Sequence, residues 1–482
     1  MAIATQLDAV LAPSTKLPTQ NLLALEVYFR ARFNGSKGTR QGFYDAVHEF
    51  EKSIEHDKNF AISYAELARH HLAQIFWSGL PAQSQMSLVQ PLIERSLEID
   101  PASSEDYTAL AVLKKHQRDF NGAAKVFERA IELSPNSISS LTEYGVFLLW
   151  NLRQPYKAVD IFTKVITLSP NDDLADTNLV NALIDAGRFD EALSRVKAII
   201  RRSPNFATAY SAKSDLHYWQ GSHLVESQLA LSKNLELDPD VPFNSMIMST
   251  IYLMVGDSDL ARDWLQYSID LAPNSDNAKF AEALIGLQRG EHGSAIDVFL
   301  GGVSDQFAFP IFVFDSVTEA LKVNRLDDVE QYYRRHYPKL FEDDAHIDAT
   351  NFIPAAAIGR ILSALGDSAR AQSLLQKCLQ VLLVVPYGGL NTRESDWKTR
   401  VYLALDHYDL AIQSFIEHVD SGQGSVTILT GDVYRPLYDR PKFQEALNRM
   451  SSRLADTRNR LKALEASGEL ITPDKMARPV PL

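Results

Sequence analysis

The chain has 482 residues, of which 48 are lysine or arginine and 61 are aspartate or glutamate, so its net charge is −13. Hydrophobic residues make up 45% and charged residues 23%, a balance that is typical of a folded globular chain and excludes overall disorder. The negative charge repels nucleic acid and anionic membranes, so we expect no direct nucleic-acid partner. The single cysteine, Cys378, excludes an intrachain disulfide and any site built from several thiolates.

The N-terminal residues lack the basic segment and apolar core of a signal peptide. The longest apolar run, around Val381 to Val385, is far shorter than the ~20 residues of a membrane helix. We therefore expect a cytoplasmic protein and no membrane insertion by this chain. A periplasmic location stays open if an N-terminal targeting or membrane segment is missing from this sequence.

In chain order, residues 1–20 are expected to form an N-terminal extension, and helical hairpins begin at Asn21. Prolines then recur between residues 100 and 273 at spacings of 34, 35, 34, 35 and 34 residues: Pro101, Pro135, Pro170, Pro204, Pro239 and Pro273. Proline cannot continue a helical hydrogen-bond ladder, so each of these positions separates two helices.

Two further sets of residues keep the same period. Twelve, eight and five residues before four of the prolines lie Ala123/Phe127/Ala130, Ala158/Phe162/Val165, Ala192/Val196/Ile199 and the equivalent trio before Pro273, Ala261/Leu265/Ser268. These offsets put each trio on one helix face, where a small first residue lets two helices approach closely. Seventeen residues after four prolines lie Gly187, Gly221, Gly256 and Gly290, where a left-handed cap would end the first helix of each pair.

These positions resemble the tetratricopeptide repeat (TPR) family, whose period is about 34 residues. One of the best units contains Tyr107, Leu110, Ala111, Ala123 and Phe127. The period alone indicates stacked helical hairpins, and the resemblance implies a right-handed superhelix with a concave groove. We therefore predict an all-α superhelical solenoid of about eleven antiparallel helix pairs.

The array is expected to be regular over residues 21–302 and degenerate over 303–442. Its interruption is marked by Gly301 and Gly302, followed by the phenylalanines Phe307, Phe309, Phe312 and Phe314. Residues 443–482 are predicted to form a helix that covers the exposed end of the stack, then a disordered tail.

The two ends of the array suggest a narrower resemblance. The segments around Tyr28-Phe29-Arg30 and Arg435-Pro436-Leu437-Tyr438 resemble the TPR regions of bacterial signalling proteins. In those proteins the repeats follow a class III nucleotide cyclase domain or a winged-helix domain, and only about twenty residues precede the first pair here. The resemblance therefore implies a regulatory, partner-binding role and no cyclase or transcription-factor activity.

No catalytic motif stands out in the sequence. It contains no phosphate-binding loop, no nucleophile elbow and no His-Glu-x-x-His pair. His70 and His71 are adjacent, so on a helix they point about 100° apart and cannot bind one ion together. Cys378 stands where the small packing residue of its helix belongs, so we expect a buried thiol. We expect no enzyme activity, no cofactor and no metal.

In TPR proteins the first helix of each pair lines the concave face. Helical spacing then gives nine candidate partner-binding residues: Lys115, His116, Trp150, Asn178, Asn181, Asp185, Asp215, Tyr218 and Trp219. Large aromatic side chains are enriched at binding hot spots, and asparagine amides both donate and accept hydrogen bonds. Packing between repeats remains an alternative for the aromatic residues, as does a solvated or capping role for the asparagines.

The sequence thus favours a non-catalytic module that binds a protein or peptide in its groove, as a regulatory, sensor or scaffold part of a bacterial signalling system. One alternative is an accessory region of a nucleotide cyclase or transcription regulator whose output domain is absent here. Another is a small-molecule sensor with a pocket at the phenylalanine-rich interruption. The oligomeric state is not predicted.

Overall fold

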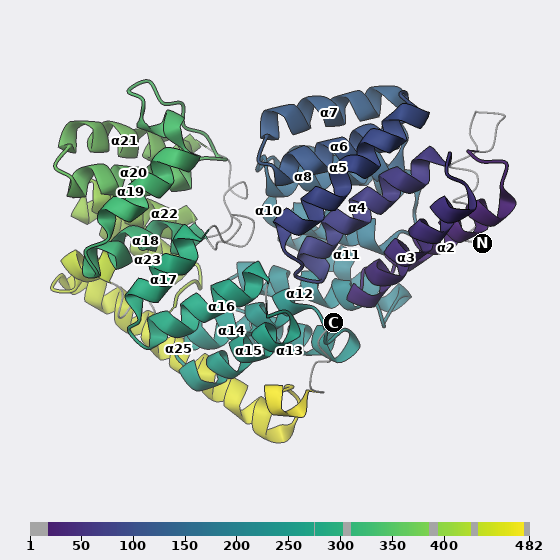
Figure 1. Ribbon diagram of the computed structural model, residues 1–482. Helices are drawn as coiled ribbons and strands as arrows, with labels where there is room; N and C mark the ends of the chain where they lie inside the picture. The colour runs from purple at the N-terminus through teal and green to yellow at the C-terminus, as the bar shows by residue number, and fades with distance from the viewer. Residues whose placement is uncertain (1–17, 274, 302–309, 385–393, 426–431, 477–482) are drawn as a thin grey trace. The chain divides into compact units, whose positions relative to one another are not determined.

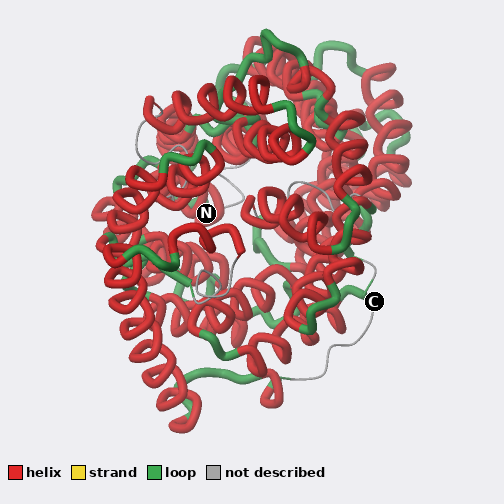
Figure 2. The backbone as a smooth tube through the Cα atoms, turned by 90° about the vertical axis from the view of Figure 1, so that its left-hand side faces the viewer, coloured by secondary structure: helices red, strands yellow, loops and turns green. Residues whose placement is uncertain are grey.

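The computed structural model describes residues 18–476 except 274, 302–309, 385–393 and 426–431. Within these ranges the regular structure is helical and contains no strand, as Figures 1 and 2 show. The prediction of an all-α solenoid is confirmed, because the described helices α2 to α23 follow one another as consecutive helices joined mostly by short turns, and neighbours along the chain pack against each other. No described helix is both long enough and apolar enough to span a membrane.

The first six pairs are α2 (Leu22–Gly35), α3 (Arg40–His56), α4 (Ala61–Trp77), α5 (Ala82–Ile99), α6 (Ser104–His116), α7 (Phe120–Leu133), α8 (Ile138–Trp150), α9 (Pro155–Leu168), α10 (Asp173–Asp185), α11 (Phe189–Arg202), α12 (Ala207–Trp219) and α13 (Leu224–Leu237). The next five are α14 (Pro242–Val255), α15 (Ser258–Leu271), α16 (Asp276–Gln288), α17 (His292–Leu300), α18 (Pro310–Lys322), α19 (Leu326–His336), α20 (Phe352–Ala364), α21 (Ser368–Val384), α22 (Glu394–Ala404) and α23 (Tyr408–Asp420). A longer helix, α25 (Pro441–Ser467), follows them.

The periodic prolines lie in the breaks between pairs, and after four of the six the residue two positions later caps the next helix. The side chains of Ser103, Ser137, Asp172 and Ser275 each accept a hydrogen bond from a backbone N–H in the following helical turn. Such a cap satisfies one of the N–H groups that have no partner inside the helix. The period of the sequence therefore indicates both where one helix ends and where the next one begins.

The residues predicted to pack on the second helices are buried. All three members of each trio before Pro135, Pro170, Pro204 and Pro273 are inaccessible to water. The four predicted glycines adopt left-handed backbone conformations, with φ between +71° and +81°. These predictions are confirmed, because the small and large residues alternate as close helix packing requires.

Four pairs make the same turn without glycine. Their left-handed residues are Arg118 (φ +65°), Arg153 (φ +53°), Asn324 (φ +56°) and Asp406 (φ +60°). Asparagine and aspartate tolerate this conformation, whereas arginine is strained there by about 1 kcal/mol.

The described residues divide into two compact units. The first comprises residues up to 183 together with 190–212 and 234–241, and the second comprises 184–189, 213–233 and 242 onward. The division of the chain into an N-terminal extension, regular array, degenerate array and C-terminal segment is a separate prediction, made from repeat quality, and it stays a prediction.

In the first unit the loop of the first hairpin returns to the last residues of the unit. The Thr208 hydroxyl donates to the carbonyl of Gly38 over 3.3 Å, and the Arg40 guanidinium donates to the carbonyl of Asp240 over 3.1 Å. A Cβ atom on Gly38 would lie 3.2 Å from the Thr208 hydroxyl, so the glycine permits this close approach.

In the second unit α25 packs against α23 and then continues to α14, as Figure 1 shows at its yellow end. The Tyr252 hydroxyl of α14 donates to Glu465 over 2.8 Å, and Lys462 pairs with Asp257 at 3.2 Å. The helix therefore covers the last pair and also joins it to the first full pair of the unit.

Two features of the sequence fall outside the described residues. The interruption around Phe307 and Phe309 lies within 302–309, and the side chains of Phe312 and Phe314 are likewise not described. The expected disordered tail lies mostly within 477–482.

Candidate partner-binding surface

The first helices of the first unit share a concave face. Helices α4, α6 and α8 pack in order against one another. Arg69 on α4 donates to Glu66 on its own helix at 2.6 Å and to Glu143 on α8, also at 2.6 Å. Arg69 therefore reaches past α6 to α8, as expected for first helices that line a concave face.

This face carries a network of buried charges. Burial alone would raise the pKa of Glu66, but the positive charges of Arg69 and Arg32, joined in acid by protonated His70, lower it to about 2. Burial lowers the pKa of His70 to about 4, so its imidazole is neutral at physiological pH. Glu66 and Glu143 therefore hold Arg69 between two carboxylates, which keeps its position fixed.

Lys115 lies on the same face but, unlike Arg69, does not lie between two carboxylates. It is half-buried on α6, and among the described residues no carboxylate lies within ion-pairing distance and no group hydrogen-bonds its ammonium. Burial and the charge of Arg69 lower the pKa of Lys115, whereas Glu143 raises it. Lys115 is thus a half-exposed cation near a negative charge but paired with none.

Arg32 on α2 resembles Lys115 in this respect. Its guanidinium lies 6.0 Å from the ring centre of Tyr28, and among the described residues it forms no ion pair with a carboxylate. The Tyr28 side chain is fully buried; burial raises its pKa, and the neighbouring charge of Arg32 acts against that rise. Arg32 therefore lies against a buried side chain, whereas Lys115 is half-exposed and within reach of a partner.

The structure places the other predicted residues of the first unit on α6, α8 and α10. Trp150 ends α8 and is 45% exposed. Asn178 and Asn181 are half-buried on α10, and the Asn181 side-chain oxygen is buried without a hydrogen-bond partner in the described part of the chain. His116, the last residue of α6, is half-buried, and burial lowers its pKa.

Four predicted residues belong to the second unit. Burial and the charge of Asp185 raise the pKa of Asp215 to about 7, and Asp215 has no hydrogen-bond partner among the described residues. Asp185 and Tyr218 are buried, and the rings of Tyr218 and Trp219 meet edge to face at 5.0 Å. The burial of Tyr218 is what the packing alternative expects, and the binding role of all nine residues stays a prediction.

The sequence also contains a pattern that indicates Glu66, Arg69 and Glu143, the charged residues that were not predicted. Glu143 and Asn178 both lie eight residues after a periodic proline, and Asn181 lies eleven residues after one. Lys58 follows Ala46, Phe50 and Ser53 at the same three offsets as the prolines follow their trios, and the same count from Lys58 gives Glu66 and Arg69. The weak first repeat, which lacks the proline, concealed this register.

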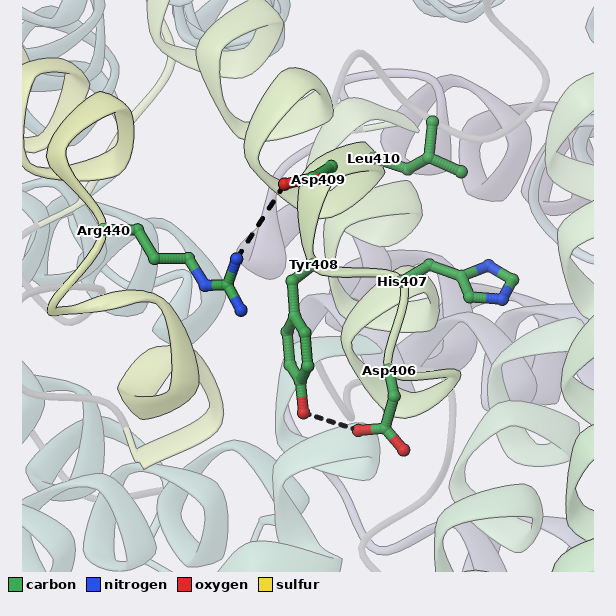
Figure 3. A pocket seen from close by; sticks show the side chains of 6 residues that line it. All are labelled: Asp406, His407, Tyr408, Asp409, Leu410 and Arg440. Atoms are coloured by element: carbon green, nitrogen blue, oxygen red, sulfur yellow. Dashed lines mark hydrogen bonds and ion pairs between the residues drawn. The ribbon is translucent and has the colours of Figure 1, made fainter.

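A separate depression of about 510 Å³ lies in the second unit at the turn between α22 and α23 (Figure 3). Its side chains interact with one another: Arg440 pairs with Asp409 at 3.8 Å and lies over the Tyr408 ring, and the Tyr408 hydroxyl donates to Asp406. Because these groups satisfy each other, the depression indicates no specific ligand.

The two adjacent histidines and the cysteine of the sequence analysis pack within the fold. In the described part of the chain, no three or more His, Cys, Asp or Glu side chains gather as a metal site. His70 contacts the Glu66 carbonyl and His71 contacts Gln85, so the two rings have different partners. Cys378 is buried, as predicted, and burial raises the pKa of its thiol to about 12.

Comparison with known proteins identifies the repeat. Residues 152–216 and 107–137 match models of the tetratricopeptide repeat. The chain therefore carries tetratricopeptide repeats, in agreement with its helix pairs. No curated protein matches the chain.

Several solved structures are similar to the chain. Yeast Tom70 is 13% identical, with a TM-score of 0.37 over 93% of this chain and 99% of its own. YrrB, described as a TPR protein with an unusual peptide-binding site, is 22% identical, with a TM-score of 0.28 over 40% of this chain and 95% of its own. The type IV pilus biogenesis factor PilW is 18% identical, with a TM-score of 0.36 over 45% and 96%. At these identities and TM-scores the solved structures support no further conclusion about this chain.

Proposed function

We propose that this chain is a non-catalytic interaction module that binds a peptide segment of a protein partner on the concave face of its first unit. The observation that carries the proposal is Lys115, a half-exposed ammonium on a first helix with no carboxylate within ion-pairing distance among the described residues. Repeats of this kind commonly present such a face to other proteins.

The chemistry of the face favours a peptide with a carboxylate. A side-chain or terminal carboxylate of the peptide would pair with Lys115, a charge-assisted bond of about 1.5–3 kcal/mol. Asn178 and Asn181 lie on a neighbouring first helix of the array and can both donate to and accept from a peptide backbone. Trp150, at the end of α8, supplies apolar area at the rim of the face.

The test starts with a displayed peptide library selected on the purified chain. Calorimetric titration of a selected peptide should show that Lys115→Ala weakens binding by about tenfold or more. The matched control is Lys125→Ala, which removes an exposed lysine from the second helix of the same pair. An equal loss of peptide affinity in both variants, or no loss in either, would contradict binding of the peptide on the concave face.

The cellular role is a further part of the proposal. The resemblance of both ends of the array to bacterial signalling proteins supports a regulatory or scaffold role in the cytoplasm. An accessory role beside an output domain, or the sensing of a small molecule, are the alternatives. Selection of a peptide that depends on Lys115 would favour the interaction module over the small-molecule sensor.

A further inference from the structure

The turn between α12 and α13 in the second unit brings two histidines together. His217 lies in the last turn of α12, and His223 is the residue directly before α13. Their rings are 30° from parallel, and the ring centres lie 5.8 Å apart. Neither histidine belongs to the first unit, so the pair is separate from the concave-face site proposed above.

His217 has a ring nitrogen that the described part of the chain leaves unsatisfied. Its Nδ1 is buried and has no hydrogen-bond partner among the described residues. In a neutral imidazole one nitrogen carries the proton and the other carries a free lone pair, and a buried polar atom without a partner is costly. The lone pair of a neutral imidazole is also the group that binds transition-metal ions.

His223 offers its ring to solvent. The residue is exposed, and its Nδ1 lies 2.9 Å from the Ser222 hydroxyl. When Nδ1 donates to this hydroxyl, the lone pair of the ring lies on Nε2, which has no hydrogen-bond partner among the described residues. Metal-bound histidines commonly form such a hydrogen bond through their second ring nitrogen, because it fixes the orientation of the ring.

The distance between the two rings is compatible with one shared ion. A zinc ion bonds an imidazole nitrogen at about 2.0–2.1 Å, which places the centres of two imidazoles on one ion roughly 5–6.5 Å apart. The observed separation of the ring centres, 5.8 Å, lies within this range. His70 and His71 differ in this respect, because each has a different partner.

The surroundings of His217 favour its neutral form. Burial lowers the pKa of His217, and the positive charges of Lys213 and of protonated His223 lower it further. A hydrogen bond with Gln220 and the charge of Glu226 act in the opposite direction. Because metal ions bind the deprotonated ring nitrogen, a lowered pKa leaves His217 able to bind an ion at neutral pH.

We propose that His217 and His223 together bind one divalent transition-metal ion, such as Zn²⁺ or Ni²⁺, with water in the remaining positions. Imidazole suits these ions, whereas Mg²⁺ and Ca²⁺ bind oxygen ligands. In the described part of the chain no three or more His, Cys, Asp or Glu side chains gather around an ion, so the pair supplies the two protein ligands.

This inference goes beyond the binding of a protein partner and does not depend on it. It also departs from the expectation of no metal, which considered adjacent histidines and not a pair on either side of a turn. An ion bound to both rings would link the end of α12 to the start of α13 and thereby stabilise the turn.

The test is calorimetric titration of zinc or nickel chloride into tag-free protein that has been dialysed against EDTA and then against buffer. We expect one ion per chain, with a Kd below about 0.1 mM. His217→Ala and His223→Ala should each weaken binding by at least about tenfold. Lowering the pH from about 7.5 to about 5.5 should also weaken it, because both rings take up protons.

The matched control is His407→Ala, which removes an exposed histidine directly before α23 and should leave the metal affinity unchanged. Because His223 is exposed, His223→Ala should fold normally, and circular dichroism checks this. Zinc should raise the Tm of the parent and of His407→Ala but not that of His223→Ala. Magnesium chloride should change none of these values.

The proposal is overturned if neither zinc nor nickel binds with a Kd below about 0.1 mM, or if His223→Ala binds the ion as well as the parent. It is also overturned if magnesium binds as tightly as zinc. If sedimentation shows that zinc joins two chains in a dimer that His217→Ala retains, the ion lies elsewhere, and the assignment to this turn is wrong.

Discussion

Two cations on the same concave face, Arg69 and Lys115, have opposite surroundings. Arg69 is enclosed by Glu66 and Glu143, whereas Lys115 has no carboxylate within ion-pairing distance among the described residues. Breaking the first arrangement leaves a buried guanidinium with less compensation, which affects folding. Removing Lys115 leaves no buried charge behind, so its loss should affect binding and have little effect on folding.

Glu66 should make the stability of the first unit depend on acid pH. Its pKa falls from an ordinary 4.5 to about 2 in the folded state, so it contributes stability above pH 4.5 that is lost as the pH falls toward 2. Glu66→Gln should lower the free energy of unfolding at pH 7 by about 3 kcal/mol. Denaturant titrations at several pH values measure this.

The matched control for Glu66 is Glu55→Gln, which changes an exposed carboxylate on α3. This control should leave both the unfolding free energy and its pH dependence nearly unchanged, because exposed charges contribute little. Parallel loss of stability in the parent and Glu66→Gln between pH 5 and 2 would contradict the assigned role of Glu66.

Asp215 should have the opposite effect. Burial and the charge of Asp185 raise its pKa from 3.8 to about 7, so the folded state binds a proton more tightly than the unfolded state. Its contribution to the free energy of unfolding therefore falls as the pH rises from 4 to 7. Asp215→Asn should stabilise the chain by about 1 kcal/mol at pH 8, discounted for partial exposure, and by almost nothing at pH 3. A variant that is equally stabilised at both pH values would show that this charge is not responsible.

At the scale of elements, much of the solenoid could be predicted from the sequence. Proline, the capping residue two positions later and the glycine of the turn are local requirements of helix ends, so they recur with the period. Arg118 and Arg153 could not be predicted as left-handed, because nothing in an arginine indicates that conformation. The half-buried positions of the concave face follow from helical spacing, but their pairing depends on curvature, which the period does not specify.

The contact that joins α25 to the first full pair of the second unit could not be predicted from the sequence either. Tyr252 and Glu465 are far apart in the chain, and a single long-range contact leaves no periodic pattern.

Also in the second unit, the α12–α13 turn lies in close contact with the turn that follows α23. Gln423 donates to the carbonyl of Trp219 over 3.0 Å, and a Cβ atom on Gly422 would lie 2.9 Å from the Cβ of Ser222.

This close approach gives a prediction for Gly422→Val. The valine should strain a left-handed residue (φ +88°) and also push the α12–α13 turn away, so hydrogen exchange in α25 should accelerate. Gly366→Val is the matched control, because Gly366 has φ +87° and no atom within 4 Å of the added Cβ. Equal acceleration in α25 from both variants would mean that backbone strain, and not the lost contact, loosens the helix.

At the scale of the whole molecule, a net charge of −13 constrains which partners can bind. An acidic peptide is repelled by the chain as a whole and attracted only by local cations such as Lys115. Its affinity should therefore fall by severalfold between about 0.05 M and about 0.5 M salt, as screening weakens the local attraction. Titrations in sodium chloride test this, and an affinity that rises steadily with salt would indicate a mainly apolar contact.

The most direct test of the concave-face assignment is photo-crosslinking of a selected peptide. Benzoylphenylalanine is placed at Asn178 on the first helix α10 in one protein, and at Lys125 on the second helix α7 in another. After irradiation, mass spectrometry identifies crosslinked peptide. We predict a crosslink from position 178 that excess unlabelled peptide abolishes, and none from position 125. A crosslink from position 125 with none from position 178 would contradict binding on the concave face.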